Sequence, residues 1–278
     1  MLILDDLSCS EELDDGVLSF EPLSEQERFC MSRAKIVLAL GANSSGKTEV
    51  LCRLAAWEMM AGHRAGRLPI HGWCTRPSFS DDIKTDPIFS KMWFGDGNNL
   101  PIIPRAMQNG IFGNPRKRME LVNGSTLSIR TWNQGDQRQQ GHSPDFILID
   151  EECDEAFFTE LCARMFRREH GWIGAAITDT RAPNWVIDLV ERAERGDTNI
   201  LLCRMRARDN THINQDQVNF FAQCMDEGER EVRVEGGLRT VDGRVYNCWS
   251  DSNWKQRDEL PLDGTDYVFI DPGTANPC

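Results

Sequence analysis

The sequence predicts an α/β fold in which a mainly parallel central sheet is flanked by helices, and three features support it. Short apolar runs alternate with helical patterns from Ala34 to about Ala182, which is typical of buried parallel strands. A glycine-rich loop lies between the apolar run 36–40 and the amphipathic stretch 48–60. A second apolar run, 146–149, ends in a group of acidic residues, where an α/β sheet carries functional side chains.

The predicted elements follow in order along the chain. Residues 1–20 are acidic and lack periodicity, so we expect a poorly ordered arm. Residues 24–27 fit a capping box and predict a helix that ends near Ser32. Residues 119–131 predict a hairpin in which Asn123-Gly124 supplies the turn. The strands predicted before residue 182 are 36–40, 69–75, 126–131, 146–149 and 173–178.

Beyond residue 182 the pattern is more mixed. Helical runs are predicted near 185–195 and 213–228. A polar connector, 255–265, precedes a last apolar strand at 267–270. The sequence contains no internal repeat and no low-complexity tract.

The composition is that of a soluble globular protein. The chain has 278 residues, of which 40% are hydrophobic and 27% charged, enough for one large domain or two smaller ones. No apolar run approaches the ~20 residues of a membrane span, and the acidic N-terminus is the opposite of a signal peptide. None of the ten cysteines forms a CxxC pair, so we expect reduced thiols and no zinc knuckle.

One loop matches the nucleotide-binding pattern GxxxxGK[ST] in full. Its residues are Gly41, Ala42, Asn43, Ser44, Ser45, Gly46, Lys47 and Thr48. After a strand and before a helix, the backbone N–H groups of such a loop can surround nucleotide phosphates. Lys47 would reach the β- and γ-phosphates, and the Thr48 hydroxyl would bind Mg²⁺. The alternative is a chance glycine-rich turn, but the flanking strand and helix favour ATP or GTP binding.

The acidic group after the run 146–149 predicts a second part of the same site. Asp150 lies at the carboxyl end of the strand, where a carboxylate can hold the Mg²⁺ that bridges the nucleotide phosphates. Glu151 can reach the water that attacks the γ-phosphate. An acidic helix start is the alternative interpretation. Because a Glu follows the Asp and no NKxD motif is present, the pattern favours an ATPase of the additional-strand (ASCE) class over a GTPase.

Further segments have an order and spacing found together in one known family. They are 22–48, 121–125, 134–136, 140–141, 178–180, 209–210, 236–237, 243–246 and 269–277. From Glu21 onward the chain resembles the large terminase subunits of tailed bacteriophages, the motors that pump DNA into capsids. Several ordered motifs at compatible spacings are more specific than any one of them.

The resemblance implies a role for each matching residue. Gln26 would contact adenine; an ordinary polar residue of a capped helix is the alternative. Asp150 would be the magnesium carboxylate and Glu151 the catalytic one. Thr178 and Thr180 would sense the γ-phosphate and couple hydrolysis to movement; a plain strand end is the alternative.

Two departures from the family pattern affect the expected chemistry. Many relatives carry Arg where this chain has Ser44, so an arginine from elsewhere becomes more necessary. Arg138 lies in the loop where relatives can carry an arginine finger for the neighbouring subunit; a surface arginine is the alternative. The sequence ends at Cys278, and of the carboxylates that such a nuclease needs only Asp271 could be present. We therefore expect the nuclease domain to be missing and the chain alone not to cleave DNA.

The resemblance divides the chain into four predicted parts. They are an acidic arm at 1–20, a P-loop ATPase core at 21–182, a small linker subdomain at 183–263, and the first strand of a truncated RNase H-like nuclease domain at 264–278.

The expected function is a motor domain that hydrolyses ATP with Mg²⁺ to move double-stranded DNA into a procapsid. The alternatives are another ASCE-type DNA translocase or helicase, and a non-catalytic nucleotide-dependent scaffold, against which Glu151 argues. The implied partners are double-stranded DNA, a portal protein, a small terminase subunit and further copies of the chain in a ring, with no membrane. The expected location is the cytoplasm of the infected bacterial host. With a net charge of −13, DNA contacts would be few and local.

Overall fold

The structure is a computed structural model that describes residues 20–77, 84, 86–95, 99–113, 118–132, 143–178 and 183–237. The chain divides into a unit of residues 1–240 and a second unit of residues 241–278. All described residues belong to the first unit. The predicted strand 267–270, and all but Phe20 of the predicted arm, lie outside the described residues.

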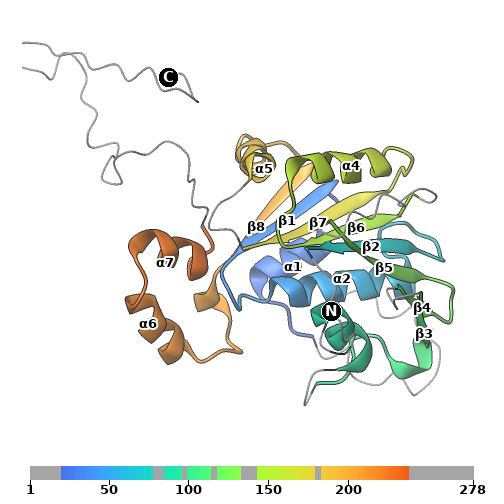
Figure 1. Ribbon diagram of the computed structural model, residues 1–278, viewed down its shortest axis with the longest axis horizontal. Coiled ribbons are helices and arrows are strands. Elements are labelled where there is room, and N and C mark those ends of the chain that lie inside the picture. Colours follow the sequence, from blue (N-terminus) through green and yellow to red (C-terminus); the bar gives the residue numbers. More distant parts are fainter. Residues whose placement is uncertain are drawn as a thin grey trace, which may run out of the picture. The chain divides into compact units, whose positions relative to one another are not determined.

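A single eight-stranded sheet forms the centre of the described structure (Figure 1). The strands are β1 Ile36–Gly41, β2 His71–Arg76, β3 Gln108–Phe112, β4 Arg118–Leu121, β5 Thr126–Thr131, β6 Phe146–Asp150, β7 Trp172–Ile177 and β8 Ile200–Met205. Their order is β3-β4-β5-β2-β6-β7-β1-β8. The six strands from β5 to β8 in this order pair in parallel, whereas β3, β4 and β5 pair antiparallel at one edge. The predicted mainly parallel sheet is confirmed.

Helices cover both faces of this sheet (Figure 1). The helices of the described residues are α1 Ser24–Met31, α2 Lys47–Ala61, α3 Pro87–Phe89, α4 Glu155–Met165, α5 Asn184–Glu194, α6 Gln215–Gln223 and α7 Glu227–Arg233, with a π-helical turn at Ser90–Phe94 and 3-10 turns at Arg105–Met107 and Ala207–Asp209. Helices α6 and α7 lie to one side of the sheet (Figure 1). Val37 of β1 faces the core that contains α1 and α2, and Leu38 faces the core that contains α4 and α5. Because both faces of β1 are buried, the strand reads as an unbroken apolar run.

The five predicted strands form at or within two residues of their predicted bounds, and β4 and β5 form the predicted hairpin. Strands β3 and β8 were not predicted. Strand β8 lies in the stretch assigned to the linker, yet it pairs in parallel with β1 and extends the main sheet. It is an edge strand with only three of six residues buried, so its apolar pattern is interrupted.

Two helix predictions need correction. The helix predicted over 213–228 is two helices, because the Asp226 side chain accepts the Glu229 N–H and caps a new start at α7. The cap of α1 is Leu23 and not Ser24, and the Gln26 side chain accepts the Leu23 N–H at 3.0 Å.

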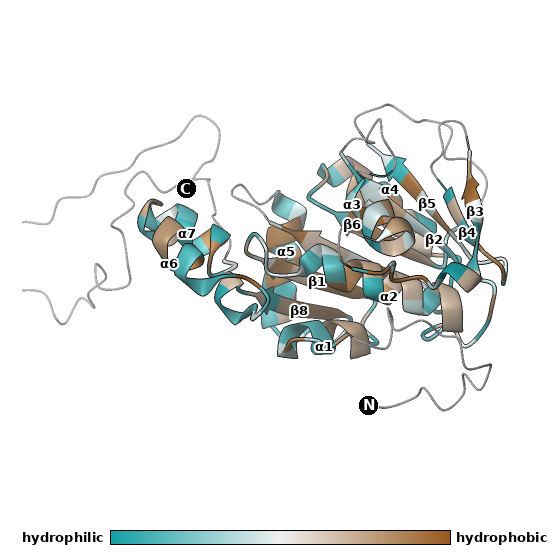
Figure 2. Ribbon diagram, turned by 90° about the horizontal axis from the view of Figure 1, so that it is seen from below, coloured by the Kyte–Doolittle hydropathy of each residue, from teal (hydrophilic) through white to brown (hydrophobic). Residues whose placement is uncertain are grey.

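Hydrophilic residues predominate on α6 and α7 (Figure 2). Within the described ranges, no helix is long and apolar enough to cross a membrane.

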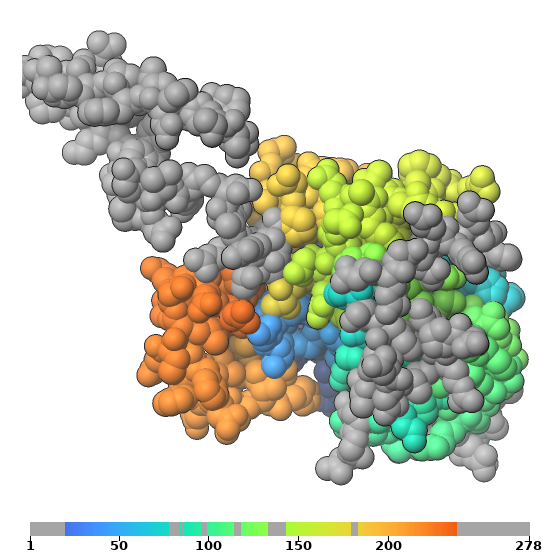
Figure 3. Space-filling model, viewed as in Figure 1, coloured from blue at the N-terminus to red at the C-terminus, as the bar shows by residue number. Residues whose placement is uncertain are grey.

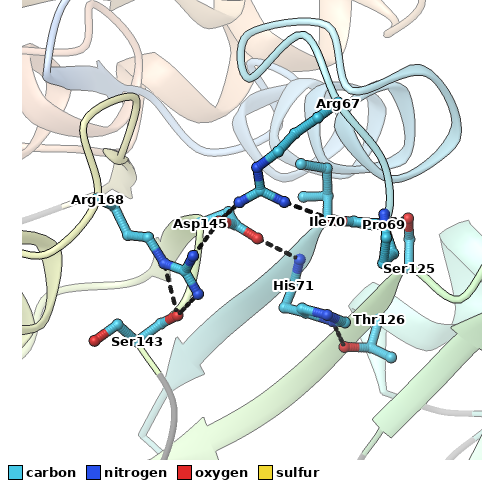
Figure 4. Close-up of polar contacts among 9 residues, drawn as sticks. All are labelled: Arg67, Pro69, Ile70, His71, Ser125, Thr126, Ser143, Asp145 and Arg168. Carbon is cyan, nitrogen blue, oxygen red and sulfur yellow. Dashed lines mark hydrogen bonds and ion pairs between the residues drawn. The ribbon is translucent and has the colours of Figure 1, made fainter.

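A buried carboxylate joins the amino ends of two central strands (Figure 4). Asp145 is 6% exposed, and its carboxylate accepts the His71 N–H at 2.9 Å. Arg67 and Arg168 form ion pairs with it, and Arg168 also donates to the Ser143 carbonyl oxygen at 2.6 Å. This network fixes the starts of β2 and β6 relative to each other, at the end of the sheet opposite to Asp150.

Candidate functional site

The strand order determines which residues meet at the carboxyl edge of the sheet. Strand β7 lies between β1, which leads into the glycine-rich loop, and β6, which ends at Asp150. The loop, Asp150 and Thr178, which follows β7, therefore lie at the same edge. Strand β7 is the additional strand between β1 and β6 that the ASCE prediction requires.

The backbone of the glycine-rich loop has a positive φ at two residues. Gly46 has a φ of +88° and caps α2, which begins at Lys47. A Cβ at Gly46 would lie 2.3 Å from Nε2 of Gln26, so a larger residue would displace this amide as well as strain the backbone. Ser44 also has a positive φ, of +59°. The loop thus presents the amino end of α2 to the cavity beside it.

Lys47 is almost fully buried and folds back over the loop. Its Nζ donates hydrogen bonds to the carbonyl oxygens of Gly41 at 2.9 Å and Ala42 at 2.5 Å. Burial lowers the pKa of Lys47 to about 8, and the nearby Asp150 carboxylate opposes this shift. The ammonium group is therefore held close to the loop by acceptors that an incoming phosphate can replace.

Thr48 and Asp150 make the contact that joins the two predicted motifs. The Thr48 hydroxyl donates to an Asp150 carboxylate oxygen at 3.1 Å, across 102 residues of sequence. Burial raises the pKa of Asp150, while the Arg76 guanidinium and the Thr48 hydroxyl oppose the shift. One hydroxyl and one carboxylate are a donor set that suits Mg²⁺, which takes its remaining oxygens from phosphates and water. The described residues contain no cluster of three or more His, Cys, Asp or Glu side chains that would hold a metal ion unaided.

Glu151 has an exposed side chain on a strained backbone. Its φ is +78°, a conformation that a non-glycine residue rarely adopts. Its N–H donates to the Ala176 carbonyl oxygen of β7 at 3.0 Å, which holds the backbone in this conformation. The chain turns away from the sheet here, so the carboxylate lies next to Asp150 in sequence but outside the strand.

A cavity of about 640 Å³ lies against the loop, within the size range of small-molecule sites. It is lined by Phe20, Glu21, Gln26, Ser44, Ser45, Gly46, Lys47, Thr48, Glu49, Arg53, Lys91, Asn99, Leu100, Ile102, Asn210 and His212. Gln26 is 5% exposed, and its amide lies directly over Gly46. The Arg53 guanidinium lies over the Phe20 ring, 4.8 Å from its centre.

Comparison with known proteins adds evidence from the fold. No protein-family model and no curated protein sequence matches the chain. The large terminase ATPase domain of Thermus phage P74-26 matches with a TM-score of 0.60 and 15% identity, over 81% of this chain and 97% of that one. The HK97 bacteriophage large terminase matches with a TM-score of 0.59 and 13% identity, over 78% of this chain and 50% of that one. The chain has the fold of a large terminase ATPase domain.

A third solved structure with this terminase fold contains nucleotide. The large terminase of the thermophilic bacteriophage D6E, in complex with ADP, matches with a TM-score of 0.57 and 12% identity, over 79% of this chain and 54% of that one. At these identities the likeness concerns the terminase ATPase fold, and the chain's own residues carry the argument about chemistry.

The structure adds residues that the motifs did not indicate. Arg76 ends β2, beside β6, and its guanidinium donates to the fully buried Asp86 at 2.8 Å. Its only sequence signal is its position after the predicted strand 69–75. Asn210 and His212, which are distant from the loop in sequence, also line the cavity. Of these two, the sequence indicated only Asn210, as a landmark of the terminase resemblance.

Three of the predicted site residues lie outside the residues that the structure describes. They are Arg138, Thr180 and Asp271. Thr178 is described and half-buried at the carboxyl end of β7. The roles assigned to these residues stay predictions.

Proposed function

We propose that the chain is the ATPase motor domain of a terminase large subunit, which hydrolyses ATP to move double-stranded DNA into a procapsid. One observation supports this more than any other: the hydrogen bond of 3.1 Å between the Thr48 hydroxyl and the Asp150 carboxylate. It joins the loop motif to the acidic motif beside a cavity of nucleotide size. The D6E terminase of the same fold binds ADP.

The proposed mechanism follows from the positions of the side chains. Lys47 exchanges its hydrogen bonds with loop carbonyls for bonds to the β- and γ-phosphates. Thr48 and Asp150 would hold Mg²⁺, which would neutralise charge on the phosphates. Glu151 orients the attacking water and accepts its proton.

Further roles belong to the same proposal. Gln26 contacts the adenine, since its amide lies over Gly46 at the cavity wall. Thr178, which follows β7, and Thr180 sense the γ-phosphate. Arg138 of a neighbouring copy stabilises the transferring phosphoryl group. The partners are double-stranded DNA, a portal protein, a small terminase subunit and further copies of the chain in a ring.

The first test is Mg²⁺-dependent phosphate release from ATP, measured against protein concentration. The specific activity of the wild type should rise with concentration, because an arginine finger in trans requires assembly. Lys47→Ala and Glu151→Gln should abolish turnover, while Glu155→Gln, the same change at an exposed site in the first turn of α4, should retain it. Tight ATP binding without turnover at any concentration would instead favour the nucleotide-dependent scaffold.

A second test addresses the movement of DNA. The wild type, supplied with ATP, should displace a third strand bound to duplex DNA without separating the duplex itself. Glu151→Gln should not displace it. Separation of the two duplex strands would favour a helicase.

A further inference from the structure

The outer side of the glycine-rich loop is held by a distant part of the chain. Three consecutive loop residues each form a hydrogen bond with the segment 205–233. The bonds are Ala42 N–H to Met205 O at 2.9 Å, Asn43 N–H to Arg233 O at 3.2 Å, and Asn210 Nδ2 to Ser44 O at 2.6 Å. In Figure 3, the orange helices α6 and α7 lie beside blue atoms from the first part of the chain.

Two glycines allow this close approach. A Cβ at Gly41 would lie 2.6 Å from the Met205 carbonyl oxygen. Gly236 has a φ of +72°, and a Cβ there would lie 2.9 Å from the same oxygen and 3.1 Å from Cα of Gly41. The backbones therefore pack directly against each other, and the contact is part of how the loop is built.

Asn210 is the one side chain among these three contacts, and its polar atoms are all used. It is 8% exposed. Its Oδ1 accepts the His212 N–H at 3.0 Å, while its Nδ2 donates to Ser44. Its backbone carbonyl accepts from Nε2 of Gln215, in the first turn of α6, at 2.8 Å. These bonds fix the direction in which the amide points.

The bond to Ser44 acts on the strained residue of the loop. Ser44 has a φ of +59°, which a non-glycine residue adopts at an energetic cost. Because a trans peptide unit is planar, fixing the Ser44 carbonyl also fixes the peptide plane that it shares with Ser45. The Asn210 amide also offsets the partial negative charge of the Ser44 carbonyl oxygen, which lies beside a cavity that would receive phosphates.

We propose that Asn210 is a positioning residue that holds Ser44 in the phosphate-binding conformation of the loop and so links nucleotide affinity to the segment 205–237. The inference rests on the proposed function in taking a nucleotide as the ligand. By linkage, nucleotide bound at the loop stabilises the packing of this segment to the same degree.

The test is calorimetric titration of the whole chain with ADP in the presence of Mg²⁺. Asn210→Asp keeps the Oδ1 that accepts from His212 but places an oxygen against the Ser44 carbonyl. The Kd for ADP should rise about tenfold, the loss of one hydrogen bond to a buried acceptor. Asn210→Ala, which removes the donor without adding charge, should show the same direction and serves if the Asp variant does not fold.

A second-site variant separates positioning from general stability. Glycine adopts a positive φ without cost, so Ser44→Gly combined with Asn210→Ala, which adds no repulsion against the residue 44 carbonyl, should recover much of the lost affinity relative to Asn210→Ala. A residue that only stabilises the segment would give no such rescue. Asn214→Ala is the matched control, because Asn214 caps α6 through Asp216 and Gln217 in the same segment. It should leave the Kd for ADP within about twofold.

The outcomes are distinguishable. Wild-type affinity in both Asn210 variants, no rescue by Ser44→Gly, or an equal loss in Asn214→Ala would overturn the positioning role and leave the proposed function standing. Normal ADP binding without ATP turnover by the wild type would overturn the motor proposal alone. A wild type that does not bind ADP would overturn both.

Discussion

Glu58 is a carboxyl group that folding places in the protein interior. It is 1% exposed near the end of α2, and it accepts the Arg64 N–H with both oxygens at 3.1 Å. Burial raises its pKa from 4.5 to about 7, against the effect of the Arg64 hydrogen bond. Between these two pH values the folded state binds more protons at Glu58 than the unfolded state. The contribution of Glu58 to the free energy of unfolding therefore falls as pH rises from 4.5 to 7.

We expect Glu58→Gln to remove this contribution while keeping an acceptor for Arg64. The free energy of unfolding of the variant, relative to the wild type, should rise between pH 4.5 and 8 by up to about 3 kcal/mol. Urea denaturation of both proteins at the two pH values measures the change. A difference between the proteins that is the same at both values would contradict the prediction.

Glu151 combines backbone strain with a proposed catalytic carboxylate. Its φ of +78° suits glycine, so Glu151→Gly should raise the free energy of unfolding by about 1 kcal/mol. Glu151→Gln removes the same charge but keeps the strain, and should leave stability nearly unchanged. Both variants should lose ATP turnover. Thermal denaturation together with phosphate release tests this, and equal stability of the two variants would show that the strain costs little.

At the scale of elements, the Asp145 network connects the starts of β2 and β6. Asp145→Asn removes the charge that Arg67 and Arg168 share. Loss of one partner of a buried pair costs several kcal/mol, but these arginine side chains are 47% and 33% exposed, so we expect about 2 kcal/mol.

The network lies at the opposite end of the strands from the cavity, and this makes the prediction specific. Chemical denaturation should show the loss of stability in Asp145→Asn, while calorimetry should show ADP binding within about twofold of the wild type. A large loss of ADP affinity would mean that the amino ends of the strands set the geometry of the loop.

Elements were predictable where burial made the sequence pattern simple. Strands β1, β6 and β7 are covered on both faces, so each is a continuous apolar run. Strand β8 is half-buried at the edge, and its Arg204 forms an ion pair with Glu194 at 2.8 Å, so its pattern resembled a solvated segment. The break between α6 and α7 depends on one cap, Asp226, which does not interrupt the helical period.

The site was predictable where the chemistry itself fixes the residue. Lys47, Thr48 and Asp150 belong to motifs in which the proposed binding of phosphate and Mg²⁺ would require those side chains at those places in the fold. Asn210 acquires its importance from a contact with Ser44 across 166 residues, and Arg76 from the pairing of β2 with β6. No local pattern can indicate such contacts before the fold is known.

For the whole molecule, net charge and the proposed assembly into a ring are connected. A net charge of −13 opposes extended contact with DNA, so each chain would contribute few, salt-sensitive contacts. A ring of chains would multiply these weak contacts through effective concentration. The same ring would place an arginine of one chain at the nucleotide of the next.

This arrangement predicts complementation between two inactive variants. Lys47→Ala lacks the phosphate-binding lysine, and Arg138→Ala lacks the proposed finger, so each alone should be nearly inactive. In a mixture, an intact Lys47 site on one chain can meet an intact Arg138 on its neighbour. Since an arginine finger is worth about 10³–10⁵ in rate, even a minority of such interfaces should raise ATP turnover well above the sum of the separate variants.

Phosphate release should peak near equal amounts of the two variants. Activity that merely averages the two variants would place the stabilising cation within the same chain. If Arg138→Ala alone kept its turnover, Arg76, near Asp150, would be the first residue to substitute instead.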